Sequence, residues 1–547
     1  MSPNLTKALR SGDAARTYHS RTKWWFEGEP DGTERILAGI PPELGPALGE
    51  QDPVNEPALF KRYRNLPEVP TGSRPIEAVG TAIAAMVSNG QGPEGAAIPD
   101  LPTLGRLLER SNGILKTWTS PWGKEIAFRA AGQTGARFHL ELYLVTGESP
   151  ELPAGVYHYD AKTNALGTLR RGDYRGYVIE ATGNEPAITT ASAILIVTSQ
   201  VWRNAWRYLD RAYRHVSWDM GTMLTNTLAM AASTGVPAEV VFGYADEAIE
   251  QLLGIDGKDE LVAGLVALGR TNRPAPTSPA VEPITHEVEP LSDQPAIEFP
   301  VIEAAYAATA LPSGPAANAW RAAIGIAPVI PPTSPPDTPP IPLRPTATSD
   351  RTIEEVIERR RSNRRYATET LIPFEVVSTV LVHAAAPPPL DVPFPPSDVY
   401  LIVNNVAELE PGAYFFDRAS QALYLLKKGD FREAAKHLTV GQQYAADAHV
   451  VAFGLADLDA IYPVYGDRGY RLALFEAALF GGRMQLAAHA LGLGAVGSVS
   501  QDDEIAPFFG PHANGKDFLF VAVFGVKRKP TQTETAEATQ FLNADRA

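Results

Sequence analysis

The sequence contains no cysteine among its 547 residues. Disulfide bonds, thiolate metal sites and a cysteine nucleophile are therefore excluded. A run of about 18 apolar residues, the length that a membrane-spanning helix needs, is also missing. The first residues, MSPNLTKALRSGDAARTYHSRTKWW, lack the apolar core of a signal peptide. These absences predict a soluble, cytoplasmic protein that has no membrane partner.

Basic residues are in the minority. Lys and Arg total 48 against 63 Asp and Glu, which gives a formal net charge of −15. Such a surface repels nucleic acid, so nucleic acid is not expected as a partner, and an anion site must be a local exception. The stretch ERRRSNRRY, residues 358–366, is that exception, because five arginines lie within seven of its positions.

Proline is unevenly distributed. Residues 271–350 contain 18 of the 48 prolines, and proline neither continues a helix nor donates to a sheet. This segment is predicted to be a linker or extended arm whose apolar middle, VIEAAYAATALPSG, packs on the protein. The predicted organisation is an N-terminal extension (1–100), a first domain (101–270), the linker (271–350), a second domain (351–530) and a C-terminal tail (531–547).

The two halves repeat each other. LPAGVYHYDAKTNALGTLRRGD (152–173) aligns with LEPGAYFFDRASQALYLLKKGD (409–430), and residues 206–235 align with residues 462–494. The second pair shares a Tyr-x-Asp-Arg-x-Tyr-Arg segment before a long helix. Short β-rich runs predict strands at 138–145, 193–197, 398–403, 449–456 and 518–526. An α+β domain is therefore expected twice, as a pseudo-twofold pair within a functionally monomeric chain.

Helical spacing in the first long helix predicts one buried face. Its methionines are interpreted as core residues rather than as a functional group. The residues that define this face are Met220, Met223, Leu224, Thr227, Leu228 and Ala231.

The arginine-rich stretch has the chemistry of a phosphate site. Arg360, Arg361, Ser362 and Arg364 combine planar guanidinium groups with a hydroxyl, which suits a phosphate dianion. On composition alone, a solvated basic helix face is an equally good interpretation.

The segment RRSNRRY resembles the Arg-Arg-Ser-x-Arg-x-aromatic signature of the FMN-dependent nitroreductase superfamily. The blocks GVYHYD and YxxxYR, with TYHSRTKWW (17–25) and ALFKRYRNLPEVP (58–70), are similar to its SagB/ThcOx-type branch. That branch is named for azoline dehydrogenases, which oxidise thiazolines or oxazolines in peptides to azoles. The resemblance covers most of the chain outside the linker and implies two tandem nitroreductase-like domains with FMN as cofactor.

The resemblance also implies how the halves share one FMN. In the superfamily, the Arg-Arg-Ser-x-Arg segment of one subunit holds the phosphate and a loop of the other subunit contacts the ring. Here the second half has the phosphate segment, and the first half has the loop, AAGQTGAR, with Gln133, Thr134, Gly135 and Arg137. The opposite pairing lacks both parts, because Glu109 interrupts LLERSNGILK and prolines replace the loop in AAAPPPLDVPFPPSD. One composite site per chain is expected.

Two further segments of the second half are assigned to this site by the resemblance. GLGAVGSVSQDDEIAPFFG resembles the family's glycine-rich loop, in which Gly494, Val496 and Gly497 bring the main chain close to the flavin. Lys527 and Arg528 match positions that reach the phosphate. On its own, a glycine pattern of this kind is more often an ordinary tight turn.

Azoline dehydrogenases use a Lys-Tyr pair for proton transfer, and this chain has no such lysine. Arg207-Tyr208 and Val464-Tyr465 stand at the two equivalent positions. The catalytic candidates are therefore Tyr465, Tyr208 and Arg207, with a tyrosine acting as acid or base if Arg207 or Arg468 lowers its pKa. The alternative is that both tyrosines only pack at the start of a helix.

Histidines suggest little further chemistry. His215 and Asp219 are four residues apart and could share a helix face, but two ligands without a third do not predict a metal site. His19 and His139 are interpreted as surface or core residues.

The expected function is that of an FMN-dependent dehydrogenase that oxidises a heterocycle or a peptide-derived C–N unit in natural-product biosynthesis. Its substrate would be a small molecule or peptide, with O2 reoxidising the flavin. The alternatives are an NAD(P)H-dependent nitro, quinone or ene reductase, and a non-catalytic scaffold of a biosynthetic complex.

Overall fold

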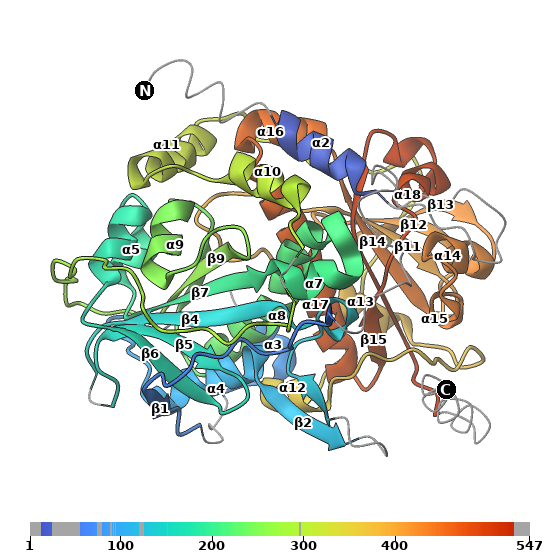
Figure 1. The fold of residues 1–547 in the computed structure, drawn as a ribbon. Coiled ribbons are helices and arrows are strands. Elements are labelled where there is room, and N and C mark those ends of the chain that lie inside the picture. The colour runs from blue at the N-terminus through green and yellow to red at the C-terminus, as the bar shows by residue number, and fades with distance from the viewer. Residues whose placement is uncertain are drawn as a thin grey trace.

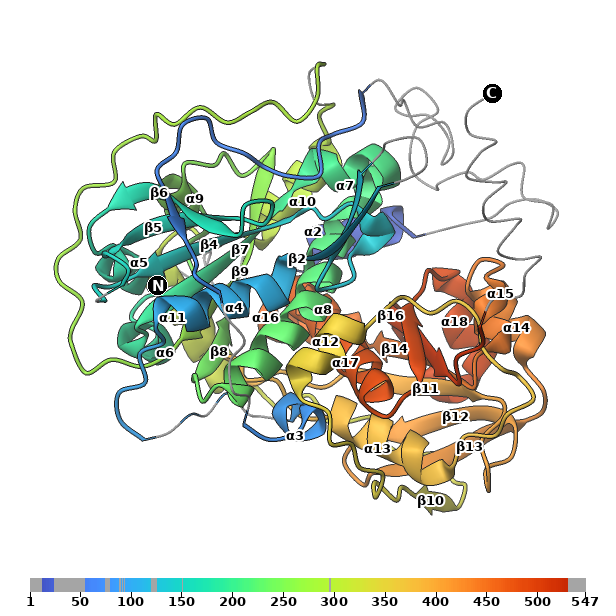
Figure 2. The same ribbon diagram turned by 90° about the horizontal axis from the view of Figure 1, so that it is seen from below.

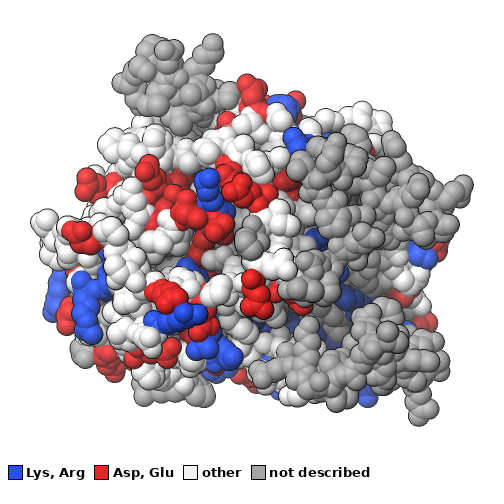
Figure 3. Space-filling model, in the orientation of Figure 1, with Lys and Arg blue, Asp and Glu red and all other residues white. Residues whose placement is uncertain are grey.

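The computed structural model describes residues 12–23, 55–73, 79–87, 90, 92, 94–119, 125–149, 151–294 and 297–529. The chain folds into two α+β domains that lie side by side, the first at the left of Figure 1 and the second at the right. Within the described ranges, no helix has the length and apolar character needed to cross a membrane. Acidic and basic side chains are interspersed over the face shown in Figure 3, where acidic ones predominate in the middle.

Each domain is built on a seven-stranded antiparallel sheet, and the two sheets have equivalent strand orders. The first sheet has the order β1-β6-β5-β4-β7-β9-β8 and the second β10-β13-β12-β11-β14-β16-β15. The first contains β1 (Glu68–Pro70), β4 (Leu140–Thr146), β5 (Gly155–Asp160), β6 (Ala165–Arg171), β7 (Ala193–Gln200), β8 (Ala238–Val241) and β9 (Glu260–Leu268). The second contains β10 (Pro340–Pro342), β11 (Asp398–Val403), β12 (Gly412–Asp417), β13 (Ala422–Lys428), β14 (Val450–Ala456), β15 (Gly494–Gly497) and β16 (Asp517–Gly525). The expected tandem α+β fold is confirmed.

The central strands are buried along their whole length because both faces of each sheet are covered. In β4, Leu142 and Leu144 enter the core that contains α8 (Ala212–Ser233), whereas Tyr143 and Val145 enter a second core. The second core lies under α5 (Arg175–Ala181), α6 (Pro186–Thr190) and α9 (Asp246–Leu253). This double burial explains why these strands are nearly continuous apolar runs and were predicted from sequence.

Two 22-residue helices, α8 and α17 (Gly469–Ala490), pack against each other between the domains (Figures 1 and 2). A side chain at Gly221 would lie 2.7 Å from the carbonyl oxygen of Phe475, and one at Gly482 would overlap Thr225. The predicted buried face is confirmed at all six of its residues, and almost every other side chain of α8 is buried as well. Its own sheet covers one side, and α17 from the other domain covers the opposite side.

The proline-rich segment carries the second copy of elements that open the first half. Helix α2 (Asp13–Arg21) precedes Thr22, whose hydroxyl accepts a hydrogen bond from Arg214 Nε at 2.9 Å. Helix α10 (Pro300–Thr309) ends at Thr309, whose hydroxyl accepts from Arg471 Nε at 2.7 Å. Likewise β1 pairs with β6 and β10 pairs with β13. The apolar middle of this segment packs on the protein as expected, since α10 buries Ile302, Ala305, Tyr306 and Thr309.

The remaining elements complete the two layers around the sheets. In the first half they are α3 (Ala82–Met86), α4 (Leu101–Asn112), α7 (Val201–Tyr208) and a separate hairpin of β2 (Ile114–Thr119) and β3 (Glu125–Arg129). In the second half they are α11 (Gly314–Gly325), α12 (Ile353–Arg359), α13 (Phe374–Ala384), α14 (Arg432–Leu438), α15 (Gln443–Asp447), α16 (Leu458–Tyr465) and α18 (Asp502–Phe509).

Candidate cofactor site

The arginine-rich segment leaves α12 and runs beside two strand ends. Thr352 and Glu355 form a capping box that starts α12, and the helix stops at Arg360, which has extended dihedral angles. Ser362 then forms a β-bridge with Ala495 of β15, and the N–H of the next residue donates to Ala495 O at 3.1 Å. The phosphate candidates are thereby brought to the ends of β15 and β16. The segment expected to be a glycine-rich loop is, at residues 494–497, an edge strand that pairs with β16.

A buried histidine fixes the backbone of this segment. His489 Nδ1 lies 2.8 Å from Gln485 O, and Nε2 lies 3.3 Å from the N–H of Arg361. Burial, with Arg360 and Lys527 nearby, lowers the pKa of His489 to about 4. The ring is therefore neutral at pH 7, so Nδ1 donates to the carbonyl and Nε2 accepts from Arg361.

Several cations converge here without a carboxylate. Arg361, Arg364 and Lys527 are exposed, and in the described part of the chain none of them forms an ion pair. Arg361 Nη1 donates only to the carbonyl oxygens of Glu358 and Arg360, at 2.8 and 2.7 Å. Burial and the nearby Arg351 lower the pKa of Lys527. Together with the hydroxyl of Ser362, this donor set fits a phosphate dianion.

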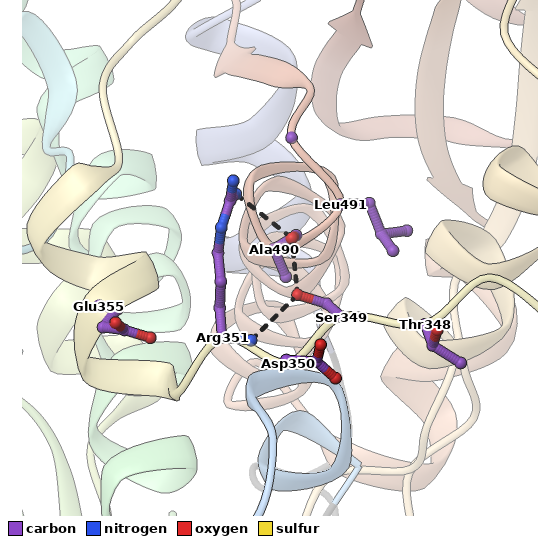
Figure 4. A pocket seen from close by; sticks show the side chains of 8 residues that line it. Thr348, Ser349, Asp350, Arg351, Glu355, Ala490 and Leu491 are labelled. Atoms are coloured by element: carbon purple, nitrogen blue, oxygen red, sulfur yellow. Dashed lines mark hydrogen bonds between the residues drawn. The ribbon is translucent and has the colours of Figure 1, made fainter.

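The neighbouring surface depression of about 480 Å³ has a structural role (Figure 4). Arg351 Nη1 donates to His489 O at 2.7 Å, and Ser349 Oγ donates to Ala490 O at 2.8 Å. Figure 4 shows Arg351 extended toward Ala490. These bonds cap the end of α17 and anchor the start of α12 on it, which sets the position of the segment that follows.

The loop of the first half reaches the same place. Arg360 Nε donates to Ala130 O at 3.2 Å, and a side chain at Gly132 would lie 3.4 Å from Arg360 Nη1. The phosphate candidate of one half therefore touches the ring candidate of the other, as the composite arrangement requires.

Within this loop, the main chain is exposed at Gly135. Gln133 Nε2 donates to Asn112 Oδ1 at 2.6 Å, and Arg137 Nη1 donates to Glu56 Oε1 at 2.8 Å, so both side chains are engaged within the protein. Gly135 is exposed and has a φ of 59°, which a glycine adopts without cost. Thr134 is held by Asp219 through its N–H and its hydroxyl.

Tyr208 lies directly against this loop. A side chain at Gly135 would overlap the hydroxyl of Tyr208, and the tyrosine ring meets His215 edge-on with centroids 4.7 Å apart. Burial raises the pKa of Tyr208, although Arg207, whose guanidinium lies 5.8 Å from the ring centroid, opposes the change. The net lowering of the pKa on which the acid or base role of this tyrosine was made conditional is therefore not found, because desolvation outweighs the cation.

Tyr465 lies on the opposite, symmetry-related side. Its hydroxyl donates to Pro393 O at 2.6 Å, and its own carbonyl oxygen accepts from Trp320 Nε1 at 2.9 Å. Burial raises the pKa of Tyr465 to about 12. Arg468 does not lower it, since its guanidinium pairs with Asp246 at 2.7 Å.

Protein fills the symmetry-related side. Helix α4 continues through the segment equivalent to RRSN, so Arg110 is buried and pairs with Glu354 at 3.1 Å. Residues 384–398, AAAPPPLDVPFPPSD, contain a proline-rich loop that is separate from the proline-rich segment 271–350. The carboxylate of Asp391 in this loop accepts hydrogen bonds from the N–H groups of Phe242 and Gly243 at 2.9 and 2.8 Å. These groups follow β8, the counterpart of β15, so a side chain of the protein occupies the backbone donors at this strand end.

Aromatic residues that the sequence did not single out lie where the two contributing halves meet. Trp218 on α8 stacks near His215 and meets Phe520 of β16 at a centroid distance of 6.1 Å. A side chain at Gly497 would lie 3.6 Å from Phe520. Trp218 Nε1 is buried with no hydrogen-bond partner among the described residues. This indole N–H therefore lies close to the Gly497–Phe520 strand region and can donate to an acceptor.

The other expected residues lie around this centre. Val496 is buried in β15 opposite Val523, Gly494 packs against Lys527, and the N–H of Arg528 donates to Arg365 O at 3.2 Å. His215 and Asp219 do not form a pair, because His215 bonds to Asn204 and Asp219 bonds to His139. The sequence could not have indicated the contact of His489 with Arg361 or of Asp219 with Thr134, because these partners are distant in the chain.

Comparisons with known proteins agree with this geometry. The profile described as the nitroreductase family matches residues 136–270 and 357–516, which together exceed half of the chain. The crystal structure of a protein from Anabaena variabilis, assigned as a nitroreductase, superposes with a TM-score of 0.71 and 25% identity. The match covers 94% of this chain and 99% of that chain, so the whole tandem arrangement is shared.

Two curated relatives are similar over shorter ranges. A Methanocaldococcus jannaschii protein assigned as a nitroreductase is 25% identical over 131 residues, 24% of this chain. The trifolitoxin-processing protein TfxB of Rhizobium leguminosarum bv. trifolii is 27% identical over 142 residues, 23% of this chain. This chain spans 66% and 36% of the lengths of these two relatives. With the profile match, the shared tandem fold and the converging basic segment, the chain belongs to the nitroreductase family.

Proposed function

We propose that this chain is an FMN-dependent oxidoreductase with one composite site, formed by the phosphate segment of the second half and the loop of the first. The observation that carries the proposal is the contact of Arg360 with Ala130, which joins the two parts beside Arg361, Arg364 and Lys527, cations with no carboxylate partner among the described residues. When bound, FMN would supply hydride transfer.

Specific residues of the chain would hold this cofactor. Arg361, Ser362, Arg364 and Lys527 would bind the phosphate, with Arg360 and Arg528 bracing the segment. The Thr134–Gly135 main chain and the glycines at 494 and 497 would border the ring, because glycine lets the backbone approach closely. Trp218 would offer its buried Nε1–H to an acceptor on the ring edge.

For the reaction, we propose oxidation of a heterocycle or a peptide-derived C–N unit in natural-product biosynthesis. The SagB/ThcOx-type blocks and the likeness to a trifolitoxin-processing protein support this class. Tyr208, beside the ring loop, would orient the substrate through its hydroxyl and exchange a proton with it. Tyr465 would have no part in this, since its hydroxyl is bonded to Pro393.

A reductase of nitro, quinone or ene substrates is the second candidate, and Tyr208 itself favours it. Because burial raises its pKa, Tyr208 is a neutral phenol at pH 7 and is better suited to donating a proton than to accepting one. A dehydrogenase needs a base at this step, and the lysine of the azoline dehydrogenases is replaced by Arg207.

Cofactor analysis and anaerobic reduction test these proposals. We expect purified protein to be yellow, with one FMN per chain. Rapid bleaching by NAD(P)H alone would favour the reductase, and bleaching only by an azoline-containing substrate would favour the dehydrogenase. Protein that stays colourless after reconstitution with FMN would refute both and leave the scaffold alternative.

A further inference from the structure

We infer that Asp219 is a positioning residue that sets the shape of the loop of Thr134 and Gly135, and thereby the placement of the flavin ring. The inference rests on the proposed function. It assigns a role to a buried carboxylate in the middle of the molecule that takes part in no other function described above.

Asp219 binds the loop through three short hydrogen bonds. Its carboxylate accepts from the N–H of Thr134 at 2.7 Å, from the Thr134 hydroxyl at 2.8 Å and from His139 Nε2 at 2.7 Å. The side chain is only 7% exposed, and in the described part of the chain no lysine or arginine pairs with it. A buried carboxylate without a fixed cation depends on such donors, so loop and carboxylate hold each other in place.

His139 connects this contact to the sheet. Its side chain is fully buried, and Nδ1 lies 2.8 Å from the hydroxyl of Ser199, near the end of the central strand β7. The imidazole thereby links the Asp219 carboxylate to the Ser199 hydroxyl. Since β7 is an interior strand that is buried along its whole length, Asp219 and His139 tie the position of Thr134 to the sheet.

The loop needs such support because its backbone is unfavourable. Ala136 and Phe138 have φ angles of 54° and 48°, and a residue with a side chain seldom adopts this left-handed conformation. Gly135, which lies between Thr134 and Ala136, also has a positive φ angle. Without Asp219, the loop would relax, and its contacts with Arg360 and Tyr208 would be disturbed.

The second half offers a matched comparison. Glu476 occupies the equivalent position on α17 and accepts from the N–H of Ser397 at 2.8 Å, at the end of the proline-rich loop. Its second partner is Arg418, at 2.7 Å, rather than a histidine. A helix carboxylate thus holds the corresponding loop in both halves, but only Asp219 holds the loop that borders the composite site.

The experiment compares Asp219→Asn with Thr134→Val, which keeps the carboxylate, and with Glu476→Gln as control. Amide hydrogen exchange of residues 131–137, measured without cofactor, should be roughly tenfold faster in Asp219→Asn, with a smaller increase in Thr134→Val. After reconstitution, FMN should still bind through its phosphate. The flavin absorption bands should shift, and reduction should slow by on the order of 10²-fold, as for a misplaced reacting group. Glu476→Gln should match the wild type in all these measurements.

Two results would overturn the inference. One is amide exchange of residues 131–137 at the wild-type rate in both Asp219→Asn and Thr134→Val. The other is a shift of the flavin absorption bands in Glu476→Gln that is as large as the shift in Asp219→Asn. If Asp219→Asn does not fold, Thr134→Val alone decides through the same measurements. Failure of the wild-type protein to bind FMN would instead refute the proposed function, while the exchange data would still report whether Asp219 holds the loop.

Discussion

Arg360 of the second half donates a hydrogen bond to the carbonyl oxygen of Ala130 of the first half, across 3.2 Å. The two residues are far apart in the chain. Arg360 belongs to the phosphate segment of the second half and Ala130 to the loop of the first half, and the other half repeats neither segment in the form that the composite site requires. In the other copy, α4 continues through the phosphate segment and Asp391 fills the backbone donors after β8. The candidate phosphate donors are therefore exposed on one side of the pseudo-twofold pair, whereas protein groups fill the equivalent positions on the other side.

Removing the phosphate donors should abolish cofactor binding. We expect Arg361→Ala combined with Ser362→Ala to weaken FMN binding by about 10²-fold or more, because each charge-assisted hydrogen bond contributes about 1.5–3 kcal/mol. Fluorescence titration of the apoprotein measures this. Arg359→Ala, at the exposed end of α12, should have little effect. Undiminished binding by the double variant, or two FMN per chain, would contradict the composite site.

The two equivalent tyrosines should behave differently. Tyr208→Phe should bind FMN normally but lower turnover by about 10²-fold or more, the usual contribution of a positioned acid. Tyr465→Phe should leave turnover unchanged and reduce the free energy of unfolding by about 1 kcal/mol, because the hydrogen bond to Pro393 O is lost. Stopped-flow kinetics and urea unfolding measure the two effects. Equal loss of activity in both variants would contradict the assignment.

Alkaline pH provides a separate check on Tyr208. Burial raises its pKa above the usual value of 10.0, so the phenol should stay protonated through neutral and mildly alkaline pH. The rate of a step that needs its proton should be constant over that range and fall only beyond about pH 10. This alkaline limb should disappear in Tyr208→Phe. A limb near neutral pH that Tyr208→Phe removes would contradict the raised pKa.

Gly135 should be intolerant of a side chain for two reasons. Alanine there would need a positive φ and would overlap the Tyr208 hydroxyl. Gly441→Ala is the matched control, since Gly441 has a φ of 73° with no atom within 4 Å of the added carbon. Both variants should lose about 1 kcal/mol of stability, but only Gly135→Ala should alter the flavin spectrum and turnover. If Gly135→Ala has the same flavin spectrum as the wild type, the proposed position of the ring beside this loop is contradicted.

Asp502 should make stability depend on acidic pH. Arg211 and Arg214 hold this buried carboxylate at 2.9 and 2.8 Å, and their charges lower its pKa to about 2 despite burial. Its folded pKa lies below the unfolded value of about 3.9, so its contribution is complete above pH 4 and is lost as the pH falls through about 2.

Urea unfolding at several pH values tests this contribution. Asp502→Asn should destabilise the protein by about 3–5 kcal/mol at pH 7, because two buried arginines lose their partner, and its deficit should shrink toward pH 2. Asp503→Asn, at the exposed neighbouring residue paired with Lys23, should cost less than about 1 kcal/mol. A deficit of Asp502→Asn that is independent of pH would contradict the lowered pKa.

Much of the fold could be predicted from sequence because its signals are local. The strands at 398–403 and 193–197 are apolar runs long enough to be read directly, and the repeat predicted a second copy of each. Helix α10 and strand β10 were not recognised as the counterparts of α2 and β1, because their sequences differ. The counterparts are recognised by the equivalent contacts that they make in the folded protein. Thr22 and Thr309 accept from equivalent arginines, although the segments around them differ.

The sequence by itself determined the tandem α+β architecture and the family, since these depend on residue types in short, ordered patterns, and it supplied the hypothesis that the second half carries the phosphate segment. It could not choose between Tyr208 and Tyr465, which have equivalent neighbours in the chain. Tertiary structure distinguishes the surroundings of the two hydroxyls. One hydroxyl lies against Gly135 of the ring loop, whereas the other is bonded to Pro393 of the loop that closes the opposite side. Burial and hydrogen-bond partners are set by residues distant in sequence, so only the packed molecule distinguishes two copies of one motif.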